Sequence, residues 1–175
     1  MLTEIGYDRR KAVQYALNWA YSRNPRFYDF ENIGGDCTNF VSQCLYAGSG
    51  VMNFSADNGW YYIDIDNRAP AWTGAQFLRD FLLTNKGEGV YGEEAPPERL
   101  SRGDVIQFRD PDGRIYHSMI ISYIMYPAVP QNIFVCAHSF DARNRRLSSY
   151  DHFKAEGIHI IGARREIPIA FPAAR

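Results

Sequence analysis

The stretch GGDCTNFVSQ, residues 34–43, places a cysteine among polar residues at the start of an apolar helix pattern. From there, apolar side chains recur at the spacing of one helix face: Phe40, Val41, Cys44 and Leu45. The pattern predicts a helix that begins at or near Cys37 and stops near Gly48. Cys37 is then either a buried structural thiol or a nucleophile, and this pattern leaves both interpretations open.

The nucleophile interpretation depends on the position of Cys37 at a helix N-terminus. A thiol reacts as the thiolate, and the unpaired N–H groups and dipole of a helix N-terminus stabilise that negative charge. The same N–H groups can bind the oxyanion that forms when sulfur attacks a carbonyl group. Gly34 and Gly35 would let a substrate approach the backbone, and the polar neighbours Asp36 and Thr38 are not typical of a packing cysteine.

The remaining pattern predicts helices first and strands afterwards. Asp8 caps an expected helix that runs to about Arg23, and another helix is expected over residues 73–84, with Thr73 and Gln76 as its capping box. Apolar runs bounded by turn signals predict four strands: residues 105–108, 115–126, 133–138 and 158–164. This order is typical of an α+β domain with an antiparallel sheet, and we expect residues 1–175 to form one domain.

The composition excludes several classes of protein. A net charge of −1 over 175 residues argues against a nucleic-acid-binding protein, which normally has a basic excess. No apolar run of about 18 residues predicts a membrane span, and the first residues lack the apolar core of a signal peptide. We therefore expect a cytoplasmic protein or an excised domain of an exported one. The three cysteines form neither an even disulfide framework nor a CxxC zinc pair.

Two of the four histidines are candidates for activating Cys37. His117 stands at the start of an apolar strand, where its ring could act as the base for the thiol. His138 ends the next predicted strand and could orient His117, with Asp141 as the alternative. Zinc bound by Cys37, His117 and His138 is a weaker hypothesis, because metal sites usually contain a close-spaced ligand pair.

The segment between the predicted helices, residues 49–72, is long and rich in aromatic residues. Loops of this length in compact domains usually carry function, so Trp60 and Trp72 are predicted to form the wall of a substrate groove. Two charged stretches, residues 93–94 and 143–146, are interpreted as exposed loops.

Three separated stretches resemble one known family: GGDCTNFVSQ (34–43), RGDVIQF (102–108) followed by HSMII (117–121), and VCAHS (135–139). They are similar to the amidase domain family found in spore-forming bacteria. That family resembles the NlpC-type and CHAP cell-wall peptidases, which are papain-like cysteine hydrolases. The resemblance implies a papain-like core with N-terminal helices and an antiparallel sheet, and chemistry that needs no cofactor.

The resemblance also implies a role for each matched residue. Cys37 would be the nucleophile, His117 the base and His138 the residue that orients the base. The implied activity is hydrolysis of an amide bond through a thioester, with a peptide or peptidoglycan fragment as substrate. Two alternatives stay open: a non-catalytic cell-wall or peptide-binding module, and a thiol acyltransferase or lipid-amide enzyme that uses the same residues.

Further positions around the nucleophile match relatives in part. Asp36 precedes the nucleophile as in NlpC-like enzymes, Thr38 replaces their usual Ser, and Tyr28 matches an upstream Tyr that contacts substrate. We therefore expect these three residues near the oxyanion or the substrate. The Gln that completes the oxyanion hole of papain-like proteases has no match, because Glu31 and Asn32 occupy that region, and the second oxyanion donor stays unassigned.

Overall fold

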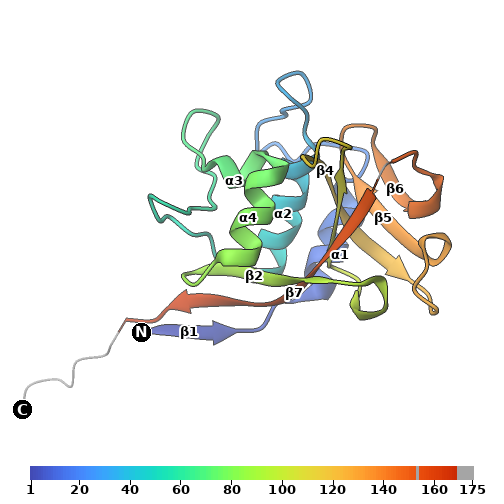
Figure 1. The fold of residues 1–175 in the computed structure, drawn as a ribbon. Coiled ribbons are helices and arrows are strands. Elements are labelled where there is room, and N and C mark those ends of the chain that lie inside the picture. Colours follow the sequence, from blue (N-terminus) through green and yellow to red (C-terminus); the bar gives the residue numbers. More distant parts are fainter. Residues whose placement is uncertain (153, 169–175) are drawn as a thin grey trace, which may run out of the picture.

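The computed structural model describes residues 1–152 and 154–168 (Figure 1). In this part of the chain the α-helices are α1 (Arg9–Trp19), α2 (Cys37–Ser49), α3 (Pro70–Thr73) and α4 (Ala75–Thr84). The strands are β1 (Leu2–Ile5), β2 (Gly89–Ala95), β3 (Val105–Arg109), β4 (Ile115–Ile124), β5 (Ile133–Ala137), β6 (Ala142–Arg146) and β7 (Lys154–Glu166). Short 3-10 helices connect some of them: η1 (Pro97–Arg99), η2 (Pro130–Asn132) and η3 (Leu147–Ser149).

The strands form one antiparallel sheet in the order β1-β7-β3-β4-β5-β6, and β2 pairs with β7 outside this path. The long helices α1, α2 and α4 lie together beside the sheet (Figure 1). Helices packed on an antiparallel sheet confirm the predicted α+β class.

Two hydrophobic cores hold these layers together. The larger core lies between the helices and the sheet, and its large buried side chains include Phe30, Phe40, Leu45, Trp60, Trp72, Phe81 and Ile120. The smaller core lies against the opposite face of β4 and includes Leu100, Ile106, Phe108, Met119, Ile121, Val135 and Leu147. Residues 119, 120 and 121 of β4 alternate between the two cores, as strand geometry requires.

Helix α2 begins at Cys37, as predicted, and ends at Ser49, beyond the predicted stop at Gly48. Gly50, whose φ is +66°, provides the C-terminal cap by donating its N–H to the carbonyl of Tyr46. Gly48 has a packing role instead, because a Cβ at that position would collide with the ring of Tyr7.

Other predicted boundaries are corrected by the structure. Helix α1 ends at Trp19 and not near Arg23. The expected helix over residues 73–84 is divided, because Thr73 ends α3 and Gly74 occupies the N-cap position of α4, where the capping box is not formed. Strands β1, β2 and β6 were not predicted: residues 93–94 lie in β2 and residues 143–146 in β6.

The groove wall predicted from Trp60 and Trp72 is wrong. Both indole rings are fully buried and pack against each other with their centroids 5.0 Å apart. Each indole N–H finds a buried acceptor on α2, the Ser42 hydroxyl at 3.0 Å for Trp60 and the Asn39 side-chain oxygen at 2.9 Å for Trp72. The aromatic residues of this segment therefore belong to the core, where their polar atoms are satisfied.

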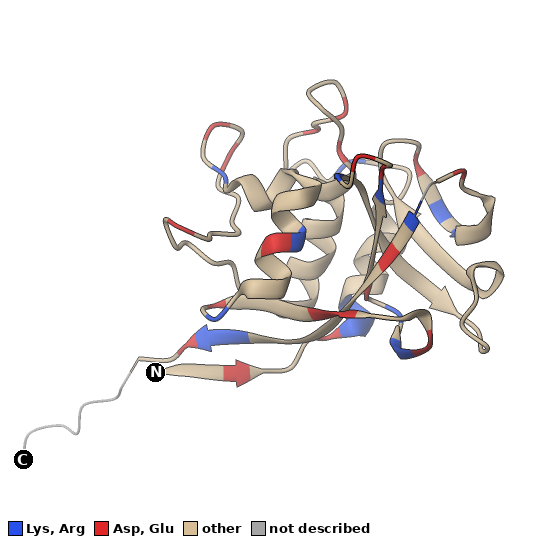
Figure 2. Ribbon diagram, viewed as in Figure 1, with Lys and Arg blue, Asp and Glu red and all other residues tan. Residues whose placement is uncertain are grey.

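Acidic and basic residues are intermixed along the helices, strands and loops of the ribbon in Figure 2. Within the described residues, none of the helices has the length and apolar character needed to cross a membrane.

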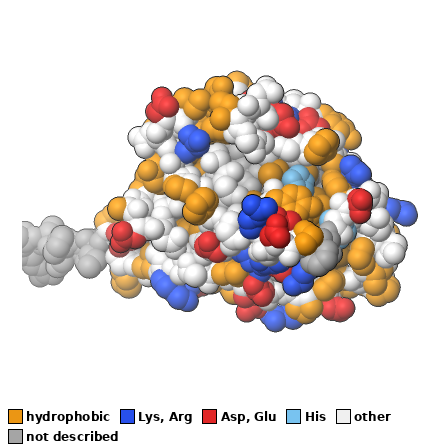
Figure 3. Space-filling model, turned by 45° about the horizontal axis from the view of Figure 1, so that its top comes forward, with side chains coloured by type: hydrophobic (Ala, Val, Ile, Leu, Met, Phe, Trp, Pro, Cys, Tyr) orange, Lys and Arg blue, Asp and Glu red, His pale blue; other side chains and the backbone are white. Residues whose placement is uncertain are grey.

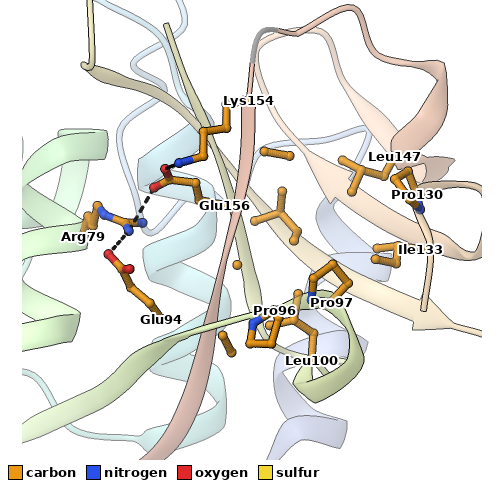
Figure 4. A pocket seen from close by; sticks show the side chains of 14 residues that line it. Arg79, Glu94, Pro96, Pro97, Leu100, Pro130, Ile133, Leu147, Lys154 and Glu156 are labelled. Atoms are coloured by element: carbon orange, nitrogen blue, oxygen red, sulfur yellow. Dashed lines mark hydrogen bonds and ion pairs between the residues drawn. The ribbon is translucent and has the colours of Figure 1, made fainter. Parts of the chain in front are cut away.

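A cavity of about 490 Å³ opens beside β7, and charged side chains close one end of it (Figure 4). The buried Arg79 of α4 contacts Glu94 of β2 and, at 2.9 Å, Glu156 of β7. Arg109 and Lys154 also reach Glu156, at 2.8 and 2.7 Å. The hydrogen bond from Arg109 lowers the pKa of Glu156 to about 2, although burial opposes the shift. The ion pairs of this cluster connect α4 to the sheet.

Glu156→Gln is expected to lower the free energy of unfolding at pH 7 by about 2 kcal/mol. A carboxyl whose pKa falls from 4.5 to about 2 on folding stabilises the protein fully above pH 4.5, and this contribution is lost as the pH falls toward 2. Urea unfolding should therefore show a smaller difference between variant and wild type at pH 3 than at pH 7. Glu98→Gln, at an exposed position, serves as the control. If Glu156→Gln lowered stability equally at pH 3 and pH 7, the low pKa assigned to Glu156 would be contradicted.

Candidate active site

Cys37 is the first residue of α2 and follows a loop with unusual backbone geometry. Gly34 and Gly35 have φ values of +92° and +100°, in the left-handed region that side chains disfavour. A Cβ on Gly35 would also lie 3.1 Å from the Ser139 hydroxyl. These two glycines allow the loop to turn sharply into the helix, and the Cys37 side chain stays 9% exposed.

Cys37 and His117 line the same cleft, which has a volume of about 360 Å³. The other lining residues are Glu31, Gly34, Gly35, Phe108, Tyr116, Ser139, Phe140, Tyr150 and Asp151. The backbone N–H of Ser118, the residue after His117, is within hydrogen-bonding reach of the Cys37 sulfur. The N-terminus of α2 and the start of β4 are thereby held together at this cleft. On the face drawn in Figure 3, histidine side chains reach the surface among hydrophobic ones.

Burial controls the protonation of both groups. It raises the pKa of the Cys37 thiol, and hydrogen bonds from Ser118 and Thr38 offset only part of this effect. Burial also lowers the pKa of His117 to about 4. At neutral pH the cleft therefore contains a thiol and a neutral imidazole, and the thiolate expected from the helix position is not the resting form.

His138 does not make the predicted hydrogen bond to His117. Its Nδ1 contacts the carboxylate of Asp36, its Nε2 lies 2.9 Å from the carbonyl of Trp19, and its ring stacks on Phe40 at 4.0 Å. The Trp19 carbonyl can only accept a hydrogen bond, and the same is true of the ionised Asp36 carboxylate. Both ring nitrogens of His138 therefore face hydrogen-bond acceptors, and Asp36 is the buried partner of this ring.

Asp36 makes several of the hydrogen bonds that hold the loop before the proposed nucleophile. Burial alone would raise the pKa of this carboxyl, but hydrogen bonds from His138, from the Asn39 side chain and from the Phe30 N–H together lower it. The Asp36 N–H donates to the Ser139 hydroxyl at 2.8 Å. Asp36 thus ties the loop, the first turn of α2 and the end of β5 together, and it does not line the cleft.

The other predicted positions also fall outside the cleft lining. Asp141 forms a two-point ion pair with Arg23, at 2.9 and 3.0 Å. The Tyr28 side chain is exposed and its ring packs on Phe30, while Thr38 is fully buried beside the Cys37 sulfur. In residues 1–152 and 154–168 we find no hydrogen bond to the His117 ring, so a third catalytic residue is not assigned.

Sequence patterns missed much of the cleft surface. Ser139 and Phe140 have φ values of +54° and +76° in the turn that follows β5, and Phe140 is 86% exposed. Tyr150 and Asp151, which also line the cleft, lie in the segment before β7. No local pattern marks such residues, because they enter the cleft only through the pairing of strands. The described residues contain no cluster of three or more His, Cys, Asp or Glu side chains suited to a metal ion.

Comparison with known proteins identifies the family. Residues 6–161 match the protein family described as “Putative amidase domain”. The chain belongs to this amidase domain family. The match includes α2 with Cys37 and β4 with His117, so both walls of the cleft lie in the shared domain.

A curated relative supports the same relationship. The chain is 33% identical over 147 residues, 83% of its length, to “Uncharacterized protein YhbB” of Bacillus subtilis (strain 168). The chain spans 45% of the length of that relative. No solved structure matches this chain.

Proposed function

We propose that this chain is a cysteine amidase or peptidase that hydrolyses an amide bond through a thioester. The observation that carries the proposal is that Cys37 and His117 line the same cleft. Membership in the amidase domain family supports hydrolysis of an amide, and the resemblance to papain-like enzymes supports the assignment of the nucleophile.

The neutral thiol and imidazole define the order of proton transfers. His117 accepts the thiol proton as the sulfur attacks the carbonyl carbon, and the N–H groups of the first turn of α2 stabilise the oxyanion. The imidazolium then gives its proton to the leaving amine, which departs and leaves the thioester. His117 next accepts a proton from water as the oxygen attacks the thioester, and returning this proton to sulfur restores the thiol. A pKa of about 4 makes the imidazolium a strong acid for the amine step.

A peptide from peptidoglycan is the substrate that the family resemblance supports. The cleft presents aromatic side chains together with the acidic Glu31 and Asp151 at its rim, a surface suited to a peptide chain. A non-catalytic binding module would release no product, and an acyltransferase would pass the acyl group to an acceptor other than water. Product analysis distinguishes all three.

Alkylation by iodoacetamide tests the proposed pair without a substrate. In wild type, the alkylation rate of Cys37 is expected to fall as the pH is lowered through about 4, where His117 becomes protonated and can no longer accept the thiol proton. In His117→Ala, we expect a rate at pH 6 that is about tenfold lower and rises steadily with pH. Peptide mapping by mass spectrometry separates Cys37 from the fully buried Cys44 and Cys136.

His152→Ala is the matched control, because the His152 ring stacks on Phe108 at 4.4 Å and does not line the cleft. We expect this variant to keep the wild-type rate at pH 6. An unchanged rate in His117→Ala would contradict the proposed pair.

A further inference from the structure

Three buried polar side chains outside the cleft form a continuous path to the Cys37 sulfur. Thr38 Oγ1 lies 3.7 Å from the sulfur and 3.1 Å from Ser118 Oγ, which in turn accepts from Gln107 Nε2 at 3.0 Å. Thr38, Ser118 and Gln107 are all fully buried. The path joins the first turn of α2 to β4 and β3, and the mechanism above does not use it.

The orientation of the Gln107 amide determines what this path can do. Gln107 Nε2 also donates to the carbonyl of Ala75 at 2.9 Å, and a carbonyl can only accept. The nitrogen therefore faces both partners, and Ser118 must accept from it. The structure has Thr38 donating to Ser118, but the hydroxyl groups of both residues can rotate, so Ser118 can also donate to Thr38.

Counting protons shows which form of Cys37 the path favours. It has three links: one between Gln107 and Ser118, one between Ser118 and Thr38, and one between Thr38 and the sulfur. One amide proton and two hydroxyl protons fill these three links when sulfur is a thiolate. When sulfur is a thiol, a fourth proton is present, and one proton has no place along the path. When His117 accepts the thiol proton, the three protons that remain can fill all three links.

We propose that Thr38, Ser118 and Gln107 are positioning residues that direct hydrogen-bond donors toward the Cys37 sulfur and stabilise its thiolate during the reaction. The inference rests on the proposed function, since it assumes that Cys37 is the nucleophile. Together with the Ser118 N–H, the path gives the buried sulfur two donors. These donors compensate for the water that burial removes from the thiolate.

The alkylation rate of Cys37 measured against pH tests this role in the absence of substrate. Thr38→Val keeps the shape of the side chain and removes the hydroxyl. We expect the alkylation rate of Cys37 at pH 7 to be about five- to tenfold lower in this variant, and the curve of rate against pH to move to higher pH. Thr38→Ser restores a hydroxyl and should recover most of the rate. Gln107→Leu should move the profile in the same direction by a smaller amount.

Two controls separate this role from a loss of structure. Thr84→Val alters an exposed threonine at the end of α4 and should leave the profile unchanged. If Thr38→Val does not fold, Ser118→Ala removes the middle hydroxyl, keeps the backbone N–H, and is expected to slow alkylation in the same way. A wild-type profile in a folded Thr38→Val or Ser118→Ala variant would overturn the inference.

The two proposals fail in different ways. If His117→Ala alkylates like wild type, the proposed function is wrong, whatever the Thr38 variants do. If His117→Ala is slow and the Thr38 and Ser118 variants are normal, only the role of the hydrogen-bond path is wrong.

Discussion

Replacing Cys37 by alanine is expected to reduce amide hydrolysis by at least about 10³-fold in kcat, because the sulfur forms and breaks the covalent bond in the proposed reaction. The side chain is small and only 9% exposed, and its removal leaves the Asp36 network intact, so the fold should persist. Peptidoglycan stem peptides incubated with each protein and analysed by mass spectrometry provide the measurement. Wild type should also show a transient mass increase on the peptide that contains Cys37, which corresponds to the thioester.

Cys136→Ala is the matched control for this variant. Cys136 is a free, fully buried cysteine on β5, and the same truncation there removes a thiol that does not line the cleft. We expect it to hydrolyse the peptides at close to the wild-type rate. A Cys37→Ala protein that keeps more than a tenth of wild-type activity would exclude the thioester route. Peptides that wild type binds and leaves intact would favour the non-catalytic binding module.

Asp36→Asn is expected to produce the largest loss of stability, about 3 kcal/mol at pH 7. The substitution removes the carboxylate that pairs with the buried His138 ring, and breaking one partner of a buried pair of this kind commonly costs about 3–5 kcal/mol. The amide oxygen of Asn can still accept from Phe30 and Asn39, which limits the loss. Urea unfolding followed by circular dichroism measures the difference.

A double-mutant cycle identifies the cause of that loss. His138→Gln removes the ring that pairs with Asp36, so the double variant should lose less stability than the sum of the losses in Asp36→Asn and His138→Gln. Asp29→Asn is the control, because Asp29 is exposed and its ion pair with Arg23, at 3.4 Å, should contribute little. Strictly additive effects at positions 36 and 138 would mean that the two residues do not act as a pair.

Stretches with strong local patterns were predicted well from the sequence. The apolar spacing after Gly35 located the start of α2 at Cys37, and the turn signals located β3, β4 and β5 to within a few residues. These predictions succeed because helix periodicity and strand alternation are properties of neighbouring residues. Strands β1 and β2 lack such a pattern and depend on pairing with β7, which lies far along the chain.

The same distinction between local pattern and tertiary contact applies to the polar and aromatic side chains. The sequence by itself determined the α+β class, the family, and the two residues, Cys37 and His117, that the structure brings into one cleft. Only the tertiary structure decided that His138 pairs with Asp36, that Trp60 and Trp72 are core residues, and that burial keeps the thiol protonated. A side chain's protonation and hydrogen bonds depend on which distant groups surround it and on how much water they exclude, and folding alone sets both.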